Sequence, residues 1–193
     1  MDLTDTMKQI ENIFPSWILE WAISEFEESL NSQIWRPYVS KDIDKKDMTG
    51  SYGTGQMLTA EISAVLSEVL HRELESYFPN INILSDTLKG SRVNWQFAIQ
   101  FPYSQLNKHS DENYAFFGTV YLMKEWKLDW GGLYLYRNGT MPKGEWNAIV
   151  PKCNTLLLET VPSSDKLHMM TTVNPWAERR FVIQIWGMKN EDE

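Results

Sequence analysis

The chain has 193 residues and a formal net charge of −8 at pH 7, from 18 Lys and Arg against 26 Asp and Glu. This length favours one domain with its own core, and an acidic chain lacks the counterion-release term that drives nucleic-acid binding, so nucleic acid is excluded as a partner. No apolar run approaches the ~20 residues that span a bilayer. The single cysteine, Cys153, excludes an intrachain disulfide, and without a signal peptide we expect a cytoplasmic protein.

The first 80 residues are expected to be mainly helical. Apolar side chains recur at helical spacing over Trp17–Phe26, and a second stripe predicts a helix over Gln56–Tyr77, which Pro79 ends. Between them, residues 37–56 carry charges and three glycines but few large apolar groups. A connection of this length is either a functional lid or a disordered loop, and the sequence leaves both readings open.

From residue 81 onward the periodicity changes to that of short strands bounded by turn residues. Eight such strands, with the helices confined to the N-terminal part, predict a mainly β fold. We expect a double-stranded β-helix, or jelly roll, over residues 81–187, with the N-terminal helices packed outside and one domain over residues 1–193. The predicted strands are Ile81–Leu84, Val93–Phe101, Phe116–Met123, Gly132–Tyr136, Ala148–Val150, Thr155–Glu159, Leu167–Val173 and Arg180–Trp186.

Two of the three histidines suggest a metal centre. His109 and Asp111 are two residues apart, so in an extended segment both side chains point to one face, and His168, 57 residues after Asp111, could supply a third ligand from another strand. Two imidazoles and one carboxylate leave coordination positions open, as in non-haem Fe(II) oxygenases. A 2-oxo acid and dioxygen would take those positions.

Arg180 follows His168 by twelve residues and opens the last predicted strand. Its guanidinium is a planar fork suited to a carboxylate. Alternation along the strand places Arg180 on the same face as Val182, Gln184 and Trp186, and Arg179 on the other. If Arg180 points inward, it can pair with the distal carboxylate of 2-oxoglutarate.

From about Phe97 to Trp186 the sequence resembles the 2-oxoglutarate- and Fe(II)-dependent oxygenases of the prolyl-4-hydroxylase type, in particular the prolyl hydroxylases that act on hypoxia-inducible factor. The matching features occur in the same order along the chain. They are His109-Ser110-Asp111, Val120–Trp126, Trp130–Leu135, Val150-Pro151, the apolar run ending at Leu158, His168, and Arg180–Trp186.

The resemblance implies a role for each matching residue. His109, Asp111 and His168 would bind Fe(II), while Arg180 and Tyr121 would hold the distal carboxylate of 2-oxoglutarate. Gln184 stands where relatives often have Ser or Thr and would contact the same co-substrate. The implied reaction is hydroxylation of an unactivated C–H bond of a peptidyl residue, an amino acid or a small metabolite. It would consume O2 and release succinate and CO2, with ascorbate as a candidate reductant.

Departures from the family pattern concern the substrate. Phe101-Pro102 stands where the hypoxia-factor enzymes have Tyr-Pro, and Glu112–Gly118 lacks the arginine that those enzymes use near substrate. These differences disfavour peptidyl proline. The candidate residues of the substrate pocket are Phe101, Trp126 and Trp130.

Three alternatives follow from the same residues. A non-catalytic jelly-roll binding module would keep a vestigial metal site, and a cupin-like enzyme would use the metal without 2-oxoglutarate, leaving Arg180 without a task. A related halogenase would carry a small residue in place of the carboxylate ligand. Because Asp111 is present, oxidation by hydroxylation or desaturation is favoured over halogenation.

Overall fold

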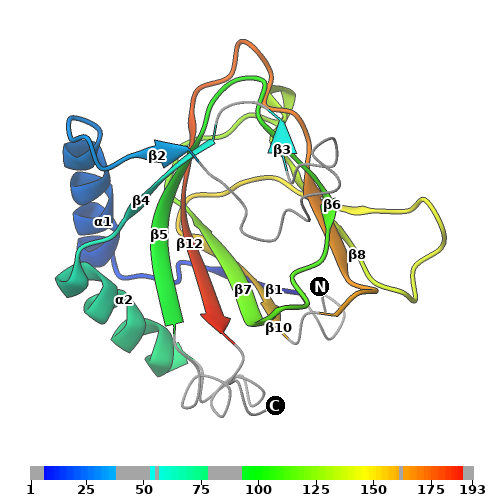
Figure 1. Cartoon of the computed structure of the whole chain (residues 1–193), viewed down its shortest axis with the longest axis horizontal. Helices are drawn as coiled ribbons and strands as arrows, with labels where there is room; N and C mark the ends of the chain where they lie inside the picture. The colour runs from blue at the N-terminus through cyan, green and yellow to red at the C-terminus, as the bar shows by residue number, and fades with distance from the viewer. Residues whose placement is uncertain (1–6, 38–52, 55–56, 78–92, 161–162, 189–193) are drawn as a thin grey trace.

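Two antiparallel β-sheets lie face to face, and two helices cover the outer face of the larger one (Figure 1). The computed structural model describes residues 7–37, 53–54, 57–77, 93–160 and 163–188. This arrangement is the double-stranded β-helix expected from the sequence, with the helices packed outside. No helix in the described ranges is both long and apolar enough to cross a membrane.

The larger sheet has seven strands in the order β1-β10-β7-β12-β5-β4-β2. Strand β12, the last of the chain, lies at its centre and pairs with β5 on one side and β7 on the other. The strands are β1 (Met7–Glu11), β2 (Arg36–Pro37), β4 (Met57–Glu61), β5 (Val93–Gln100), β7 (Tyr114–Tyr121), β10 (Thr155–Thr160) and β12 (Arg180–Met188).

The smaller sheet has five strands in the order β3-β6-β11-β8-β9. At its centre β11 pairs with β6 on one side and β8 on the other. The strands are β3 (Gly53–Thr54), β6 (Gln105–His109), β8 (Tyr134–Arg137), β9 (Asn147–Ile149) and β11 (Leu167–Met170). A short 3₁₀ helix, η2 (Leu128–Trp130), precedes β8.

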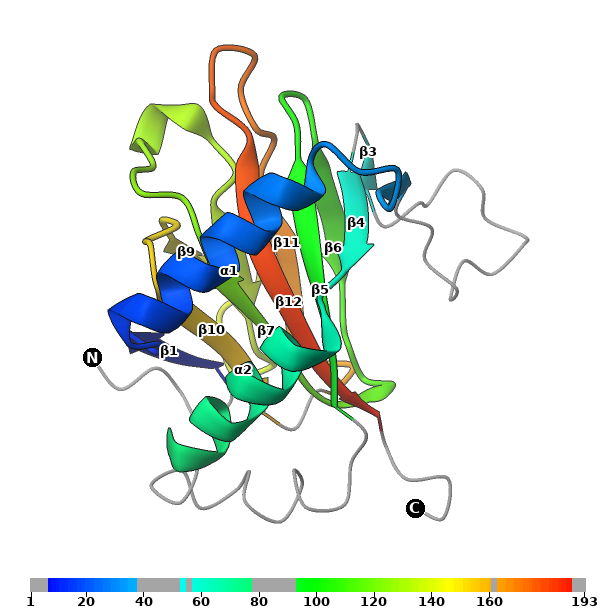
Figure 2. The same cartoon turned by 90° about the vertical axis from the view of Figure 1, so that its left-hand side faces the viewer.

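The outer core forms where α1 (Ser16–Ser29) and α2 (Ala64–Tyr77) lie across the larger sheet (Figure 2). Helix α1 buries one face at four-residue spacing, through Ile18, Ala22 and Phe26. These side chains pack with outward-facing residues of the central strands, among them Ile183 and Ile185. Burial of this apolar stripe, at about 25 cal/mol per Å² of apolar surface, holds the helices on the sheet.

A second, inner core fills the space between the two sheets. Alternate residues of the central strands point into it, such as Tyr121 and Val182 of the larger sheet and Tyr134 and Met170 of the smaller one. Since successive side chains of a strand point to opposite faces, one strand contributes to both cores. The inner core is where polar side chains of the two sheets meet.

Most of the predicted elements are confirmed, with ends that move by a few residues. The first helix is present as α1, and β5, β7, β8, β9, β10, β11 and β12 correspond to predicted strands. The predicted strand Ile81–Leu84 lies outside the described residues, as does most of the loop at 37–56, so neither expectation is tested.

The predicted helix over Gln56–Tyr77 is wrong in its first part. Met57–Glu61 is strand β4, which pairs with β5, and α2 begins only at Ala64. Ser63 caps it, because its Oγ accepts a hydrogen bond from the Leu66 N–H at 3.2 Å. The apolar residues of Met57–Glu61 are compatible with a strand as well as with a helix, and pairing with β5 makes the segment a strand. The strands β1, β2, β3 and β6 were not predicted either.

Candidate metal centre

His109 and His168 are brought together by strand pairing in the smaller sheet. His109 is the last residue of β6 and His168 the second residue of β11, and the antiparallel register places them directly opposite each other. Their ring centroids lie 4.2 Å apart. Residues directly opposite in an antiparallel pair share one face, so both imidazoles enter the space between the sheets.

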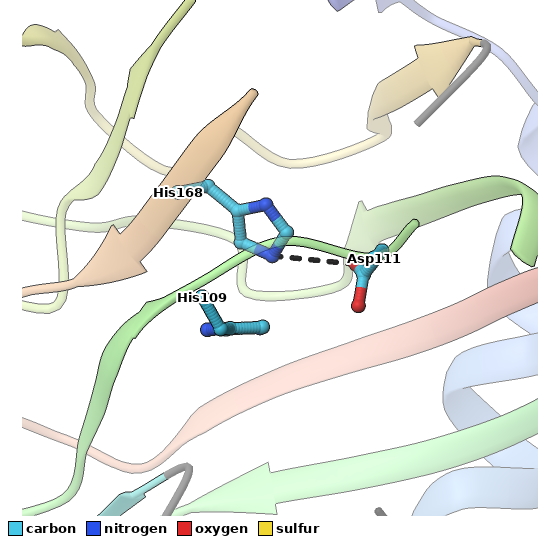
Figure 3. Close-up of side chains that lie close together, drawn as sticks. All are labelled: His109, Asp111 and His168. Carbon is cyan, nitrogen blue, oxygen red and sulfur yellow. Dashed lines mark ion pairs between the residues drawn. The ribbon is translucent and has the colours of Figure 1, made fainter. Parts of the chain in front are cut away.

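Asp111 completes the group from the turn that follows β6. Its Oδ2 lies 3.3 Å from Nε2 of His168, and the three side chains converge (Figure 3). One ligand atom from each of His109, Asp111 and His168 lies within 4.8 Å of the others. Asp111 and His168 are buried, and His109 is partly buried. Among the described residues, this is the one group of three His, Cys, Asp or Glu side chains able to hold a metal ion.

Burial keeps both imidazoles neutral. Desolvation and, to a smaller extent, the neighbouring His168 lower the pKa of His109 from 6.5 to about 4. The pKa of His168 is also lowered by burial, against the opposing charge of Asp111. A metal ion binds the neutral imidazole, so near neutral pH neither ring has to lose a proton before it can coordinate.

Arg180 lies deep in the same interior, as the strand alternation predicted. It is the first residue of β12 and is only 3 % exposed. Its Nη1 donates a hydrogen bond to Oε1 of Gln100, the residue opposite it on β5. The guanidinium carbon lies 4.8 Å from the centroid of the Tyr121 ring. Gln100 therefore fixes one arm of Arg180 beside Tyr121.

Two buried polar side chains lie next to each other here. Nε of Arg180 and the Tyr121 hydroxyl make no hydrogen bond of regular geometry within the described residues, although the two side chains interact with each other. Burial raises the pKa of Tyr121, so its hydroxyl keeps its proton and can donate. Buried donors are nearly always satisfied in native proteins, and an unsatisfied one costs about 1–3 kcal/mol. A carboxylate bound between Arg180 and Tyr121 would satisfy both.

Gln184 is placed on the inner face, but part of its side chain is already engaged. Gln96 donates from Nε2 to Oε1 of Gln184 at 2.6 Å, across from β5 to β12. If Gln184 contacts a co-substrate, it would do so through its amide nitrogen. That contact stays a prediction.

The three residues expected in a substrate pocket have packing roles. Trp126 and Trp130 belong to the inner core, with ring centroids 5.2 Å apart, and Nε1 of Trp126 donates to the Gly131 carbonyl. Phe101 packs against the outer, helix-covered core, and the Arg179 guanidinium lies 5.5 Å from its ring. A substrate contact by these residues stays a prediction.

Two further interior residues were not singled out from the sequence, Glu159 and Tyr134. Glu159 is 3 % exposed, and its Oε2 lies 3.3 Å from Nδ1 of His168. The Tyr134 ring stacks on the His168 ring, with centroids 5.3 Å apart. A carboxylate at the end of an apolar strand, Leu156-Leu157-Leu158-Glu159, is the sequence signal for the first, because such a strand is expected to be buried. No sequence signal distinguishes Tyr134 from a core tyrosine.

Opposite pH dependences are expected from His109 and Glu159 in the metal-free protein. The pKa of His109 is below its usual value, so the stability that it contributes is present above pH 6.5 and is lost as pH falls toward 4. Burial raises the pKa of Glu159 from 4.5 to about 7, so its contribution is present below pH 4.5 and is lost as pH rises toward 7. Each change corresponds to at most roughly 3 kcal/mol.

Denaturant unfolding of metal-free protein between pH 4.5 and 6.5 checks this expectation. As pH falls, His109→Asn should gain stability relative to the unsubstituted protein, whereas Glu159→Gln should lose it. Both differences are read at each pH from the free energy of unfolding. Profiles of the two variants that run parallel to the unsubstituted protein would contradict the expectation.

Comparison with known proteins gives one family match and several similar structures. Residues 101–188 match the family described as the 2OG-Fe(II) oxygenase superfamily. Comparison with curated protein sequences gave no match.

Several solved structures share the fold. A prolyl-4-hydroxylase from Pseudomonas putida has a TM-score of 0.70 at 13 % identity, covering 98 % of this chain and 96 % of that one. A Trichoplax adhaerens prolyl hydroxylase, solved with a peptide of hypoxia inducible factor, has a TM-score of 0.71 at 16 % identity, covering 96 % and 84 %. The epimerase SnoN from nogalamycin biosynthesis has a TM-score of 0.62 at 14 % identity, covering 96 % and 78 %.

Proposed function

We propose that the chain is a 2OG-Fe(II) oxygenase, because residues 101–188 match that superfamily and three side chains suited to Fe(II) converge. On this proposal it is an oxidoreductase, a dioxygenase that hydroxylates a C–H bond of an organic substrate. The proposed co-substrates are 2-oxoglutarate and O2, and the proposed co-products are succinate and CO2. The substrate class extends over a peptidyl residue, an amino acid or a small metabolite.

The observation that carries the proposal is the convergence of His109, Asp111 and His168 on one point. Two neutral imidazoles and one carboxylate form the donor set that non-haem Fe(II) oxygenases use. A closed cage of protein ligands would bind iron but leave no place for co-substrates, and among the described residues only these three side chains converge. When bound, Fe(II) supplies the activation of O2 and the oxidation of the substrate.

The chain's own residues would bind and orient 2-oxoglutarate. Arg180 and Tyr121 lie in the interior that the metal group faces, and Nε of Arg180 and the Tyr121 hydroxyl are buried donors available to the distal carboxylate. A charge-assisted pair of this kind fixes the direction of the bound acid as well as its affinity. The apolar surroundings, including Val182 and Met170, would exclude water from the reacting centre.

The remaining expectations belong with this proposal. We propose one domain over residues 1–193, because the sheet that carries the helices on its outer face lines the site with its inner face. A cytoplasmic location is proposed from the single cysteine, Cys153. Ascorbate as reductant rests on the family resemblance alone.

The direct test is succinate formation by purified protein supplied with Fe(II), 2-oxoglutarate and O2, first alone and then with amino acids, short peptides and metabolite pools. We expect slow succinate release without substrate and faster release with the right substrate class. A non-catalytic binding module would release no succinate under any condition. A cupin-like enzyme would show no calorimetric signal with 2-oxoglutarate.

Removing the Tyr121 hydroxyl tests the co-substrate site on its own. Tyr121→Phe is expected to weaken 2-oxoglutarate binding by about 10-fold or more, since a hydrogen bond to a charged group is worth about 1.5–3 kcal/mol. Isothermal titration with the metal-loaded protein measures this. Tyr77→Phe is the control. Tyr77 is the last residue of α2, outside the two sheets, and its hydroxyl donates a hydrogen bond to the Asn12 carbonyl. Equal affinities in the two variants would remove Tyr121 from the site.

A further inference from the structure

Glu159 occupies a place beside the metal group that the proposed function does not use. It lies near the end of β10, is 3 % exposed, and stands opposite Phe117 of β7 in the larger sheet. His168 belongs to the other sheet. The 3.3 Å approach of Glu159 Oε2 to Nδ1 of His168 therefore joins the two sheets across the interior.

A carboxylate faces each nitrogen of the His168 ring, although neither Nδ1 of His168 nor Oε2 of Glu159 makes a hydrogen bond within the described residues. Nε2 faces Oδ2 of Asp111 at 3.3 Å, and Nδ1 faces Glu159 at the same distance. Tyr134 stacks on the ring with its plane tilted by 18°, and the Phe117 ring is nearly parallel to it at 6.2 Å. This packing restricts rotation of the ring, so Nε2 is the nitrogen directed at the metal group.

The chemistry of an imidazole ligand requires a partner on the second nitrogen. A neutral imidazole carries one N–H, so a ring that binds metal through Nε2 must keep its proton on Nδ1. That proton needs an acceptor. His109 has a backbone one, because its Nδ1 lies 2.6 Å from the Asn107 carbonyl oxygen. For His168, the group in the equivalent place is the buried carboxylate of Glu159.

We propose that Glu159 is a positioning residue of the metal centre: when metal is bound at Nε2, the Glu159 carboxylate is the acceptor for Nδ1–H of His168, since these two buried atoms lie 3.3 Å apart and have no other hydrogen-bond partner within the described residues. The inference rests on the proposed function, because it presumes that His168 binds metal. Glu159 would be an outer partner, a residue that contacts the ligand His168 and not the metal. The two histidines then differ in kind, one held by a neutral carbonyl and the other by a carboxylate. A carboxylate partner also makes the imidazole a more basic ligand.

The test uses Zn(II)-loaded full-length protein, because Zn(II) is diamagnetic and permits proton NMR of the imidazole N–H groups. The chain has only three histidines, and the third, His71, lies on α2 with its side chain 32 % exposed, where its N–H exchanges with water. We expect two slowly exchanging Nδ1–H signals, from His109 and His168. In Glu159→Leu one should disappear while that of His109 remains as an internal control.

Zn(II) affinity is the second readout. Glu159→Leu is expected to weaken it by about 10- to 100-fold, the usual effect of losing an outer partner. Glu159→Gln keeps the size and a carbonyl acceptor, so its His168 signal should persist at a shifted position and its affinity should fall less. Glu112→Gln, at an exposed carboxylate next to Asp111, controls for the loss of negative charge near the metal group and should bind Zn(II) almost as the unsubstituted protein does.

The outcomes separate this inference from the proposed function. If the unsubstituted protein binds no divalent metal, the metal centre itself is wrong. If the unsubstituted protein binds metal and Glu159→Leu keeps both Nδ1–H signals and the same Zn(II) affinity, only the role proposed for Glu159 is wrong. Two other results would also overturn the positioning role and leave Glu159 as a negative charge only. The first is weaker Zn(II) binding in Glu159→Leu with both Nδ1–H signals intact. The second is an equal loss of Zn(II) affinity in Glu112→Gln.

Discussion

His168→Ala is expected to abolish metal binding and, with it, succinate formation. The change removes one of only three converging ligand atoms, and the described part of the chain offers no other His, Cys, Asp or Glu group of three to replace it. The loss of metal affinity should exceed the roughly 10- to 100-fold that follows from losing an outer partner of a ligand. Purified protein with Fe(II) and 2-oxoglutarate, kept free of oxygen, should show a weak visible charge-transfer band that the variant lacks.

His71→Ala is the matched control for this experiment. His71 is on the outer helix α2 and lies 3.4 Å from Glu75, so the same substitution there should leave the band and the metal affinity unchanged. Circular dichroism and thermal unfolding of both variants establish that each is folded. A His168→Ala protein that is folded and keeps the band would show that the ligand assignment is wrong.

Arg180→Ala is expected to separate co-substrate binding from metal binding. Arg180 is buried and is the charged donor available to a carboxylate beside Tyr121. Losing two charge-assisted hydrogen bonds costs about 3 kcal/mol or more, which is at least about 100-fold in 2-oxoglutarate affinity. Metal affinity should change by only a few-fold, because Arg180 is not part of the ligand group. Calorimetry with metal and then with 2-oxoglutarate measures both.

Arg179→Ala provides the control at the neighbouring position. Arg179 is exposed and lies over the Phe101 ring on the outer side, so its removal should leave 2-oxoglutarate affinity unchanged. Arg180→Ala should also lose some stability, because Oε1 of Gln100 then has no donor in the interior, at a cost of about 1–3 kcal/mol. Equal weakening of metal and 2-oxoglutarate in Arg180→Ala would instead indicate collapse of the interior.

Features that depend on local alternation were predictable from the sequence. The period of two along β12 placed Arg180 and Val182 on one face and Ile183 and Ile185 on the other. The structure confirms this division, with Val182 in the inner core and both isoleucines in the helix-covered core. Such a prediction needs only the geometry of one strand, which does not change with its neighbours.

Features that depend on which strands pair were missed. Met57–Glu61 has side chains that serve a helix or a strand, and its pairing with β5 makes it a strand. The local sequence does not indicate that β5 is its partner, since β-sheet preference reflects contacts with neighbouring strands more than the residues themselves. The same holds for β1 and β6, whose few apolar residues gave no strand pattern.

The same distinction, between what the local sequence predicts and what strand pairing decides, applies to the candidate site. The sequence by itself determined the types of group present: a His-x-Asp pair, one distant histidine, and an arginine twelve residues later on an inward-facing parity. Only the tertiary structure decided that His109 stands opposite His168, that Gln100 holds Arg180, and that Glu159 reaches His168 from the other sheet. These contacts follow from the register of strands and the packing of two sheets, and both are set by side chains far apart in the chain.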